Sequence, residues 1–267
     1  MTPSRDIADL LALMARLRRD CPWDAKQTNQ SLVPYVIEEA YELAEAIVRG
    51  DIDDIKGELG DVLLQVVFHA QLYCEQGKFD FGDVIYQLME KLIRRHPHVF
   101  DKENLKTDED VKRRWDEIKA LENQGKPPRR ILDVNAGSSL MQAYDVQKAA
   151  AKVGFDWDHL DDAVAKLYEE IGELAELIRD AKGNYLDKAN IDSQKVSDEI
   201  GDCFFSLVNV ARKLGVNSEM ATLGAVMKFR RRFEFIEDRL IEQGKTVNDA
   251  TLDEMDRLWD LAKTTGL

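Results

Sequence analysis

Two acidic segments in the second half of the chain, Glu169-Glu170-Ile171-Gly172-Glu173 and Glu199-Ile200-Gly201-Asp202, decide how the sequence is interpreted. Both have counterparts in the first half, Glu38-Glu39-Ala40-Tyr41-Glu42 and Glu58-Leu59-Gly60-Asp61. Three flanking landmarks recur in the same order: Trp23-Asp24 and Trp157-Asp158, Lys91 to Arg95 and Lys228 to Arg232, Trp115-Asp116 and Trp259-Asp260. Landmarks repeated in one order predict an internal duplication.

The two copies meet in the stretch 124–130, Gln-Gly-Lys-Pro-Pro-Arg-Arg. A proline pair cannot continue a helix, and the residue before a proline is pushed toward an extended conformation. A length of 267 residues fits two small domains. We therefore predict an N-terminal domain over 1–130 and a C-terminal domain over 131–267.

The apolar residues within each copy follow a helical period. Val164, Leu167, Ile171, Leu174 and Ile178 fall three or four residues apart, and 59–70 contains a similar stripe. Glycine and proline are scarce, at 15 and 6 residues, and no segment shows convincing strand alternation. The pattern predicts an all-α protein built from two duplicated domains that resemble four-helix bundles, with about four helices in each.

Composition places the chain among folded, water-soluble proteins. Hydrophobic residues make up 44% and charged residues 33%, with a net charge of −14. The sequence has neither an apolar run long enough for a membrane span nor a secretory signal, so we expect a cytoplasmic protein. Three scattered cysteines argue against disulfides and thiolate zinc sites. The acidic balance argues against binding to duplex nucleic acid.

The carboxylates of each copy are spaced for a shared site. Residues three apart on a helix are neighbours, so Glu39 lies beside Glu42 and Glu170 beside Glu173. The companion segments repeat this spacing, and antiparallel packing of the two helices would bring four carboxylates together. The alternative is that such glutamates form a solvated helix face. Hard oxygen ligands without cysteine or histidine nearby favour Mg²⁺, Mn²⁺ or Ca²⁺.

Cations in the second copy could meet an anionic ligand. Lys195 lies one turn before Glu199, and Lys228, Arg231 and Arg232 form a basic run. The alternative for the run is ion pairing on a solvated helix. Trp115 and Trp259 could stack on a base, although a tryptophan at the end of an amphipathic helix is more often a core anchor.

The repeated Glu-Glu-x-x-Glu and Glu-x-x-Asp elements resemble the signature of the MazG nucleoside triphosphate pyrophosphohydrolases, an all-α family. The resemblance covers nearly the whole chain, including Cys21-Pro22-Trp23-Asp24 and 94–100. It implies hydrolysis of nucleoside triphosphates, and of deoxynucleoside triphosphates, to the monophosphate and pyrophosphate, by metal-assisted attack of water on the α-phosphorus. It also implies a Mg²⁺-dependent homodimer, with Mn²⁺ as an alternative ion.

The resemblance also assigns roles to residues. The implied metal ligands are Glu170, Glu173, Glu199 and Asp202, with Glu39, Glu42, Glu58 and Asp61 in the first copy. Lys195 and Glu169 carry the implied catalytic roles, and substrate contacts fall on Lys166, Lys228, Arg231, Arg232 and Trp259. In the first copy Asp54 stands where Lys195 would be expected. This difference agrees with the second copy being the active one in two-domain relatives.

Three alternative functions share some features with this sequence. A Nudix hydrolase shares part of the Glu169–Gly172 segment, but the rest of its motif and its strands are missing. A di-iron bundle needs a histidine three residues after a glutamate, and none of the four histidines has that spacing. The first copy could also be a non-catalytic binding or regulatory module. Pyrophosphate release from the two halves would distinguish the last alternative.

Overall fold

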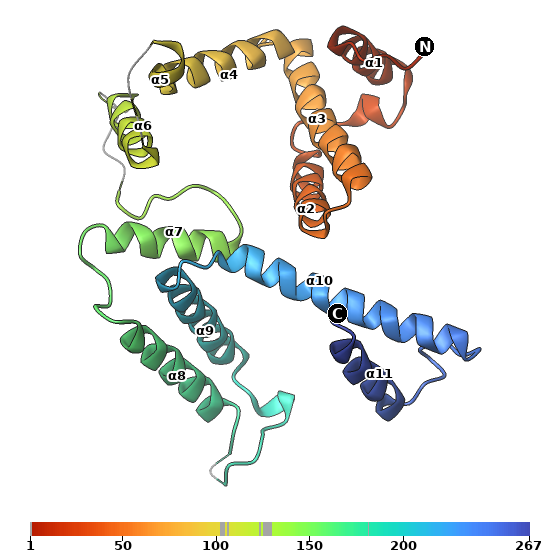
Figure 1. Ribbon diagram of the computed structural model, residues 1–267, viewed down its shortest axis with the longest axis vertical. Helices are drawn as coiled ribbons and strands as arrows, with labels where there is room; N and C mark the ends of the chain where they lie inside the picture. The colour runs from red at the N-terminus through yellow and green to blue at the C-terminus, as the bar shows by residue number, and fades with distance from the viewer. Residues whose placement is uncertain (1, 102–104, 106, 123, 125–129, 181) are drawn as a thin grey trace. The chain divides into compact units, whose positions relative to one another are not determined.

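The computed structural model describes residues 2–101, 105, 107–122, 124, 130–180 and 182–267, and divides the chain into two compact units, Met1–Pro127 and Pro128–Leu267 (Figure 1). Over these described residues every regular element is helical, apart from a single bridge between Arg179 and Tyr185. The all-α prediction is confirmed. Most of the predicted join at 124–130 lies outside the described residues. None of the described helices is long and apolar enough to cross a membrane.

Unit 1 is organised around a helical hairpin. Its elements are α1 (Ile7–Asp20), the 3₁₀ helix η1 (Asp24–Lys26), α2 (Val33–Arg49), α3 (Ile52–Glu75), α4 (Phe81–Arg95), α5 (Pro97–Phe100) and α6 (Asp108–Glu122). Gly50 and Asp51 alone connect α2 to α3. Gly50 ends α2 at φ 80°, a conformation that glycine adopts without strain, and the Asp51 carboxylate accepts hydrogen bonds from the first amides of α3. This tight connection makes α2 and α3 antiparallel neighbours.

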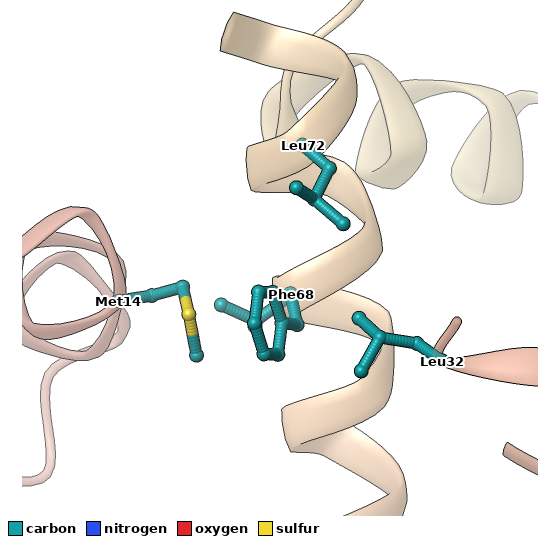
Figure 2. Packing of buried hydrophobic residues seen from close by; sticks show 5 residues of the cluster. Met14, Leu32, Phe68 and Leu72 are labelled. Carbon is teal, nitrogen blue, oxygen red and sulfur yellow. The ribbon is translucent and has the colours of Figure 1, made fainter. Parts of the chain in front are cut away.

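The best-packed core of unit 1 lies where α1 and the segment before α2 meet α3. Figure 2 shows Met14 reaching from α1 toward Phe68 of α3, with Leu32 approaching from the other side and Leu72 one turn along. All four side chains are buried, as is the neighbouring Val67. Burying apolar side chains of this size stabilises a fold by about 1.5–3 kcal/mol each. The core therefore anchors α3, the helix that carries Glu58 and Asp61.

Unit 2 repeats the hairpin with a longer connection. Its elements are α7 (Ser139–Ala151), α8 (Leu160–Leu177), the 3₁₀ helix η2 (Lys188–Asn190), α9 (Ser193–Lys213), α10 (Ser218–Glu242) and α11 (Leu252–Thr264). The helices α8 and α9 pack along each other, α7 lies against α9, and α11 folds back along α10 (Figure 1). The segment 178–192 connects α8 to α9. Both units contain more helices than the about four predicted.

The face of α8 that is buried differs from the predicted apolar stripe. Ile171, expected in the stripe, is 46% exposed, whereas Glu170 is only 6% exposed. In α3 likewise Leu59 and Val66 are exposed, although Val67 is fully buried. In each hairpin the two helices pack through the faces that carry the carboxylates. Apolar side chains such as Leu59 and Ile171 therefore remain exposed on a different face.

Candidate active site

In unit 1 the hairpin brings together carboxylates from both of its helices. Glu39 comes from α2, and Glu58 and Asp61 come from α3, one turn apart. Each offers an oxygen, and these three oxygens lie within 4.8 Å of one another. Glu42 lies one turn after Glu39 on α2, near enough for its charge to act on both glutamates of the group. We call Glu39, Glu58 and Asp61 the first carboxylate group.

In unit 2 the α8–α9 hairpin forms the equivalent arrangement. Glu170 of α8 and Glu199 and Asp202 of α9 bring three carboxylate oxygens within 4.8 Å of one another. Glu173 follows one turn after Glu170, and its pKa responds to the charges of Glu170 and Glu199. We call Glu170, Glu199 and Asp202 the second carboxylate group. The structure therefore brings three of the four predicted ligands of each copy together, with Glu42 or Glu173 one turn away.

Crowding changes the acid–base behaviour of these side chains. Burial raises the pKa of the Glu39 carboxyl, and the nearby charges of Asp61, Glu42 and Glu58 raise it further. Burial followed by the charges of Glu42 and Asp61 raises the pKa of Glu58 in the same way. In unit 2 the pKa of Glu173 is raised for the same reasons. Glu39, Glu58 and Glu173 therefore hold negative charge under unfavourable conditions.

The donor atoms fit a divalent cation of the hard class. The Oε2 atoms of Glu58 and Glu199 are buried and have no hydrogen-bond partner. A buried carboxylate oxygen without a partner is costly, because it has lost water and gained nothing in exchange. A cation bound by all three oxygens of a group would remove both this cost and the repulsion among the carboxylates. Oxygen ligands of this kind suit Mg²⁺ or Mn²⁺.

The two lysines near the second carboxylate group lie differently. The Lys166 ammonium is 2.8 Å from both Glu169 and Glu170, so this predicted substrate contact is an internal counter-ion in the structure. These hydrogen bonds raise the pKa of Lys166. Lys195, in the first turn of α9, is exposed, and its ammonium lies 3.9 Å from Asp192. It therefore lies one turn from Glu199 but pairs with Asp192.

The predicted basic run lies on α10 and contacts α11. The Arg232 guanidinium donates a hydrogen bond to the Leu267 carbonyl at 2.8 Å and lies 5.5 Å from the centre of the Trp259 ring. The Phe229 ring also contacts Trp259, with 5.0 Å between the ring centres. Lys228 and Arg231 are exposed. Arg232 and Trp259 therefore contact each other where α10 meets α11. Neither residue pairs with the second carboxylate group.

Gln65 is a site residue that the sequence analysis missed. It is 7% exposed, donates a hydrogen bond to Glu39, and leaves its own Oε1 buried without a partner. Its position one turn after Asp61 on α3 was the available signal, because residues four apart share a helix face. Ser206 occupies the equivalent place after Asp202 and is also buried. The residue at this position therefore differs between the units.

Comparison with known proteins agrees with this geometry. The model of the MazG nucleotide pyrophosphohydrolase domain matches residues 27–100 and 160–235, and each match contains one carboxylate group. The nucleoside triphosphate pyrophosphohydrolase of Escherichia coli K12 is 42% identical over 95% of both chains. The pyrophosphohydrolase/pyrophosphatase MazG of Thermotoga maritima is 42% identical over 96% of this chain and 94% of its own.

A third relative, the uncharacterized protein YabN of Bacillus subtilis, is 43% identical over 92% of this chain but only 48% of its own length. The same pair of domains therefore also occurs as part of a longer protein. Two matched domains, a carboxylate group in each, and similarity over nearly the full length lead to one assignment: this chain belongs to the MazG family of nucleotide pyrophosphohydrolases.

Proposed function

We propose that this chain hydrolyses nucleoside triphosphates, including deoxynucleoside triphosphates, to the monophosphate and pyrophosphate, and that unit 2 carries the activity. The second carboxylate group is the observation that carries the proposal, because it combines crowded acids with a buried unpartnered oxygen on Glu199. The Escherichia coli and Thermotoga maritima relatives are nucleoside triphosphate pyrophosphohydrolases, which supports the same reaction.

Glu170, Glu199 and Asp202 would hold Mg²⁺, or Mn²⁺ in its place, with Glu173 beside them. When bound, the ion supplies Lewis acidity and positive charge beside the phosphate oxygens. The first carboxylate group, with Glu42, offers the same ligand types in unit 1. Unit 1 has Asp54 where unit 2 has Lys195, and this difference supports placing the reaction in unit 2.

The chain's own residues would position and activate the reactants. Glu169 is exposed beside the second carboxylate group and is held by Lys166, so we assign it to take a proton from the attacking water. The water oxygen forms a bond to the α-phosphorus, and the bond from this phosphorus to the bridging oxygen breaks, which releases pyrophosphate. Lys195 would move from Asp192 to the phosphate oxygens and stabilise the charge that develops there.

We propose in addition that a second copy of the chain completes the protein as a homodimer. Exposed apolar side chains on the α8–α9 hairpin support this, because a water-exposed face of this kind favours a covering partner. They include Tyr168 at 70%, Phe204 at 57% and Leu207 at 52% exposure. The contacts we assign to the triphosphate and base, Lys228, Arg231, Arg232 and Trp259, lie on the other hairpin of unit 2.

A nucleotide panel with labelled water tests the reaction. The purified chain is given each triphosphate with increasing Mg²⁺, in water labelled with heavy oxygen. We expect pyrophosphate as the first product and the label in the monophosphate, because the bond forms at the α-phosphorus. Orthophosphate as the first product, or label in pyrophosphate, would contradict the proposal.

The variant Glu170→Gln tests the site. It should lower turnover by more than about a hundredfold while the helical circular dichroism stays unchanged, because one ligand charge is lost from a packed hairpin. Glu176→Gln makes the same chemical change at an exposed position of α8 and should leave turnover unchanged. Equal activity in the two variants would remove the second carboxylate group from the mechanism.

A further inference from the structure

Two adjacent arginines at the end of α4 are bound by one carboxylate of α6. The Glu122 oxygens accept hydrogen bonds from Arg95 at 2.6 and 3.1 Å and from Arg94 at 2.9 and 3.1 Å. Glu122 is only 18% exposed at its side chain, and Glu90 pairs with Arg94 from the preceding turn. The paired guanidinium groups thus present several N–H donors toward one point, an arrangement suited to phosphate as well as to carboxylate.

The contact is electrostatically strong. Hydrogen bonds from Arg95 and then Arg94 lower the pKa of the Glu122 carboxyl to about 2. Glu122 therefore remains charged throughout the neutral range, and both of its oxygens lie where phosphate oxygens could bind. An anion that binds these arginines from solution must therefore compete with the Glu122 carboxylate, which belongs to the same chain.

The surroundings have the size and chemistry for more than a single ion. A cavity of about 710 Å³ opens beside the pair, and it is lined by Arg94 and Arg114 together with the acids Asp101 and Glu122. Pockets for small ligands have volumes of about 300–1,000 Å³. Next to it the Trp115 ring lies 5.8 Å from the Arg95 guanidinium. A cationic pair and an indole ring are therefore neighbours in unit 1.

Unit 2 contains the same arginine–tryptophan pair with a different third member. Arg232 lies 5.5 Å from the Trp259 ring, as Arg95 lies beside Trp115, but its hydrogen bond goes to the main-chain oxygen of Leu267. In unit 1 the third member is a side chain from another helix, Glu122 of α6, and it binds both adjacent arginines. Because Glu122 is a side chain, a single substitution can remove the charge that competes with phosphate for these arginines.

We propose that Arg94 and Arg95 form a polyphosphate-binding site in unit 1 that is distinct from the carboxylate groups and is kept closed by Glu122. Polyphosphate would displace Glu122 from the arginines and release the end of α6 from α4. Binding there uses guanidinium groups alone, so it needs neither a divalent cation nor hydrolysis. The site would bind free pyrophosphate or the triphosphate of a nucleotide through the same contacts.

Calorimetric titration of the full chain with inorganic pyrophosphate in EDTA tests the proposal. Glu122→Gln removes the competing charge and should tighten binding by about tenfold or more, since a charge-assisted contact no longer has to be broken. Adding Arg95→Gln to that variant should abolish the gain. Glu109→Gln, which makes the same change at an exposed position in the first turn of α6, should bind as the wild type does.

Three results would overturn the proposal: unchanged affinity in Glu122→Gln, a gain that survives Arg95→Gln, or sulfate binding as tightly as pyrophosphate at equal ionic strength. Hydrogen exchange of the wild-type chain keeps the test decisive if Glu122→Gln does not fold. Saturating pyrophosphate should then lower the protection of α6, and unchanged protection would count against displacement of Glu122. Because EDTA is present throughout, the outcome is independent of nucleotide hydrolysis.

Discussion

The side chain of Glu58 combines two unfavourable conditions, a buried oxygen without a partner and neighbouring carboxylates of the same charge. Burial and these charges raise its pKa in the folded protein above the usual 4.5, so the folded state binds the proton more tightly than the unfolded state does. Stability from this group is therefore present at low pH and is lost as the pH rises from about 4.5 through the raised folded value.

Glu58→Gln should accordingly be more stable than the wild type in EDTA, with a difference that grows across that pH window. Mg²⁺ should reduce the difference by stabilising the wild type, because the cation replaces the lost proton. Thermal unfolding of both proteins, with EDTA or Mg²⁺, measures this. If the variant were less stable than the wild type at neutral pH in EDTA, Glu58 would not be a strained ligand.

Single residues also show what sequence spacing leaves undecided. Lys166 and Lys195 both lie four residues before a glutamate of the second carboxylate group, yet only Lys166 pairs with its glutamate. Lys195 has Asp192 three residues before it as a competing partner, and the spacing alone does not choose between them. The acidic neighbourhoods could be predicted from the sequence; the partner of each lysine could not.

At the scale of elements, the start of α9 depends on its cap. The Asp192 carboxylate accepts a hydrogen bond from the Lys195 amide at 3.3 Å, which holds the turn carrying Lys195. We expect Asp192→Ala to destabilise the protein by about 0.5–2 kcal/mol in chemical denaturation and to lower turnover by displacing Lys195. Asp192→Asn retains a capping oxygen, so it should keep most of the stability.

The helices themselves were predictable, but the sides they bury were only partly so. The period of apolar residues indicated helices over α3 and α8, because this period differs from that of a strand. The same pattern placed Ile171 in the core, yet Ile171 is exposed and Glu170 is buried. Helix periodicity measures where apolar residues lie on one helix, whereas burial depends on where the second helix packs.

For the whole molecule, the duplication was readable from five repeated landmarks, and the two matches to one domain confirm it. The boundaries 1–130 and 131–267 stay predictions. What the sequence left open is how far the copies share one function, since both contain a carboxylate group.

Equivalent substitutions in the two units of the full chain should show which unit catalyses pyrophosphate release. Asp202→Asn should remove nearly all pyrophosphate release, whereas Asp61→Asn should change it by less than about twofold, because unit 1 has no counterpart of Lys195. Initial rates with the same triphosphate measure both. Similar losses in the two variants would show that the units act together.

The connections within the hairpins have a mechanical consequence. Gly50 and Asp51 tether α2 directly to α3, whereas 178–192 separates α8 from α9. The entropy of closing a chain grows with its length, so the second hairpin receives less help from its tether in keeping its acids together. The association of α8 with α9 therefore depends more on side-chain packing, and on neutralisation of the carboxylate charges, than that of α2 with α3 does. A shortage of divalent ions would loosen the unit to which we assign catalysis before it loosened the other.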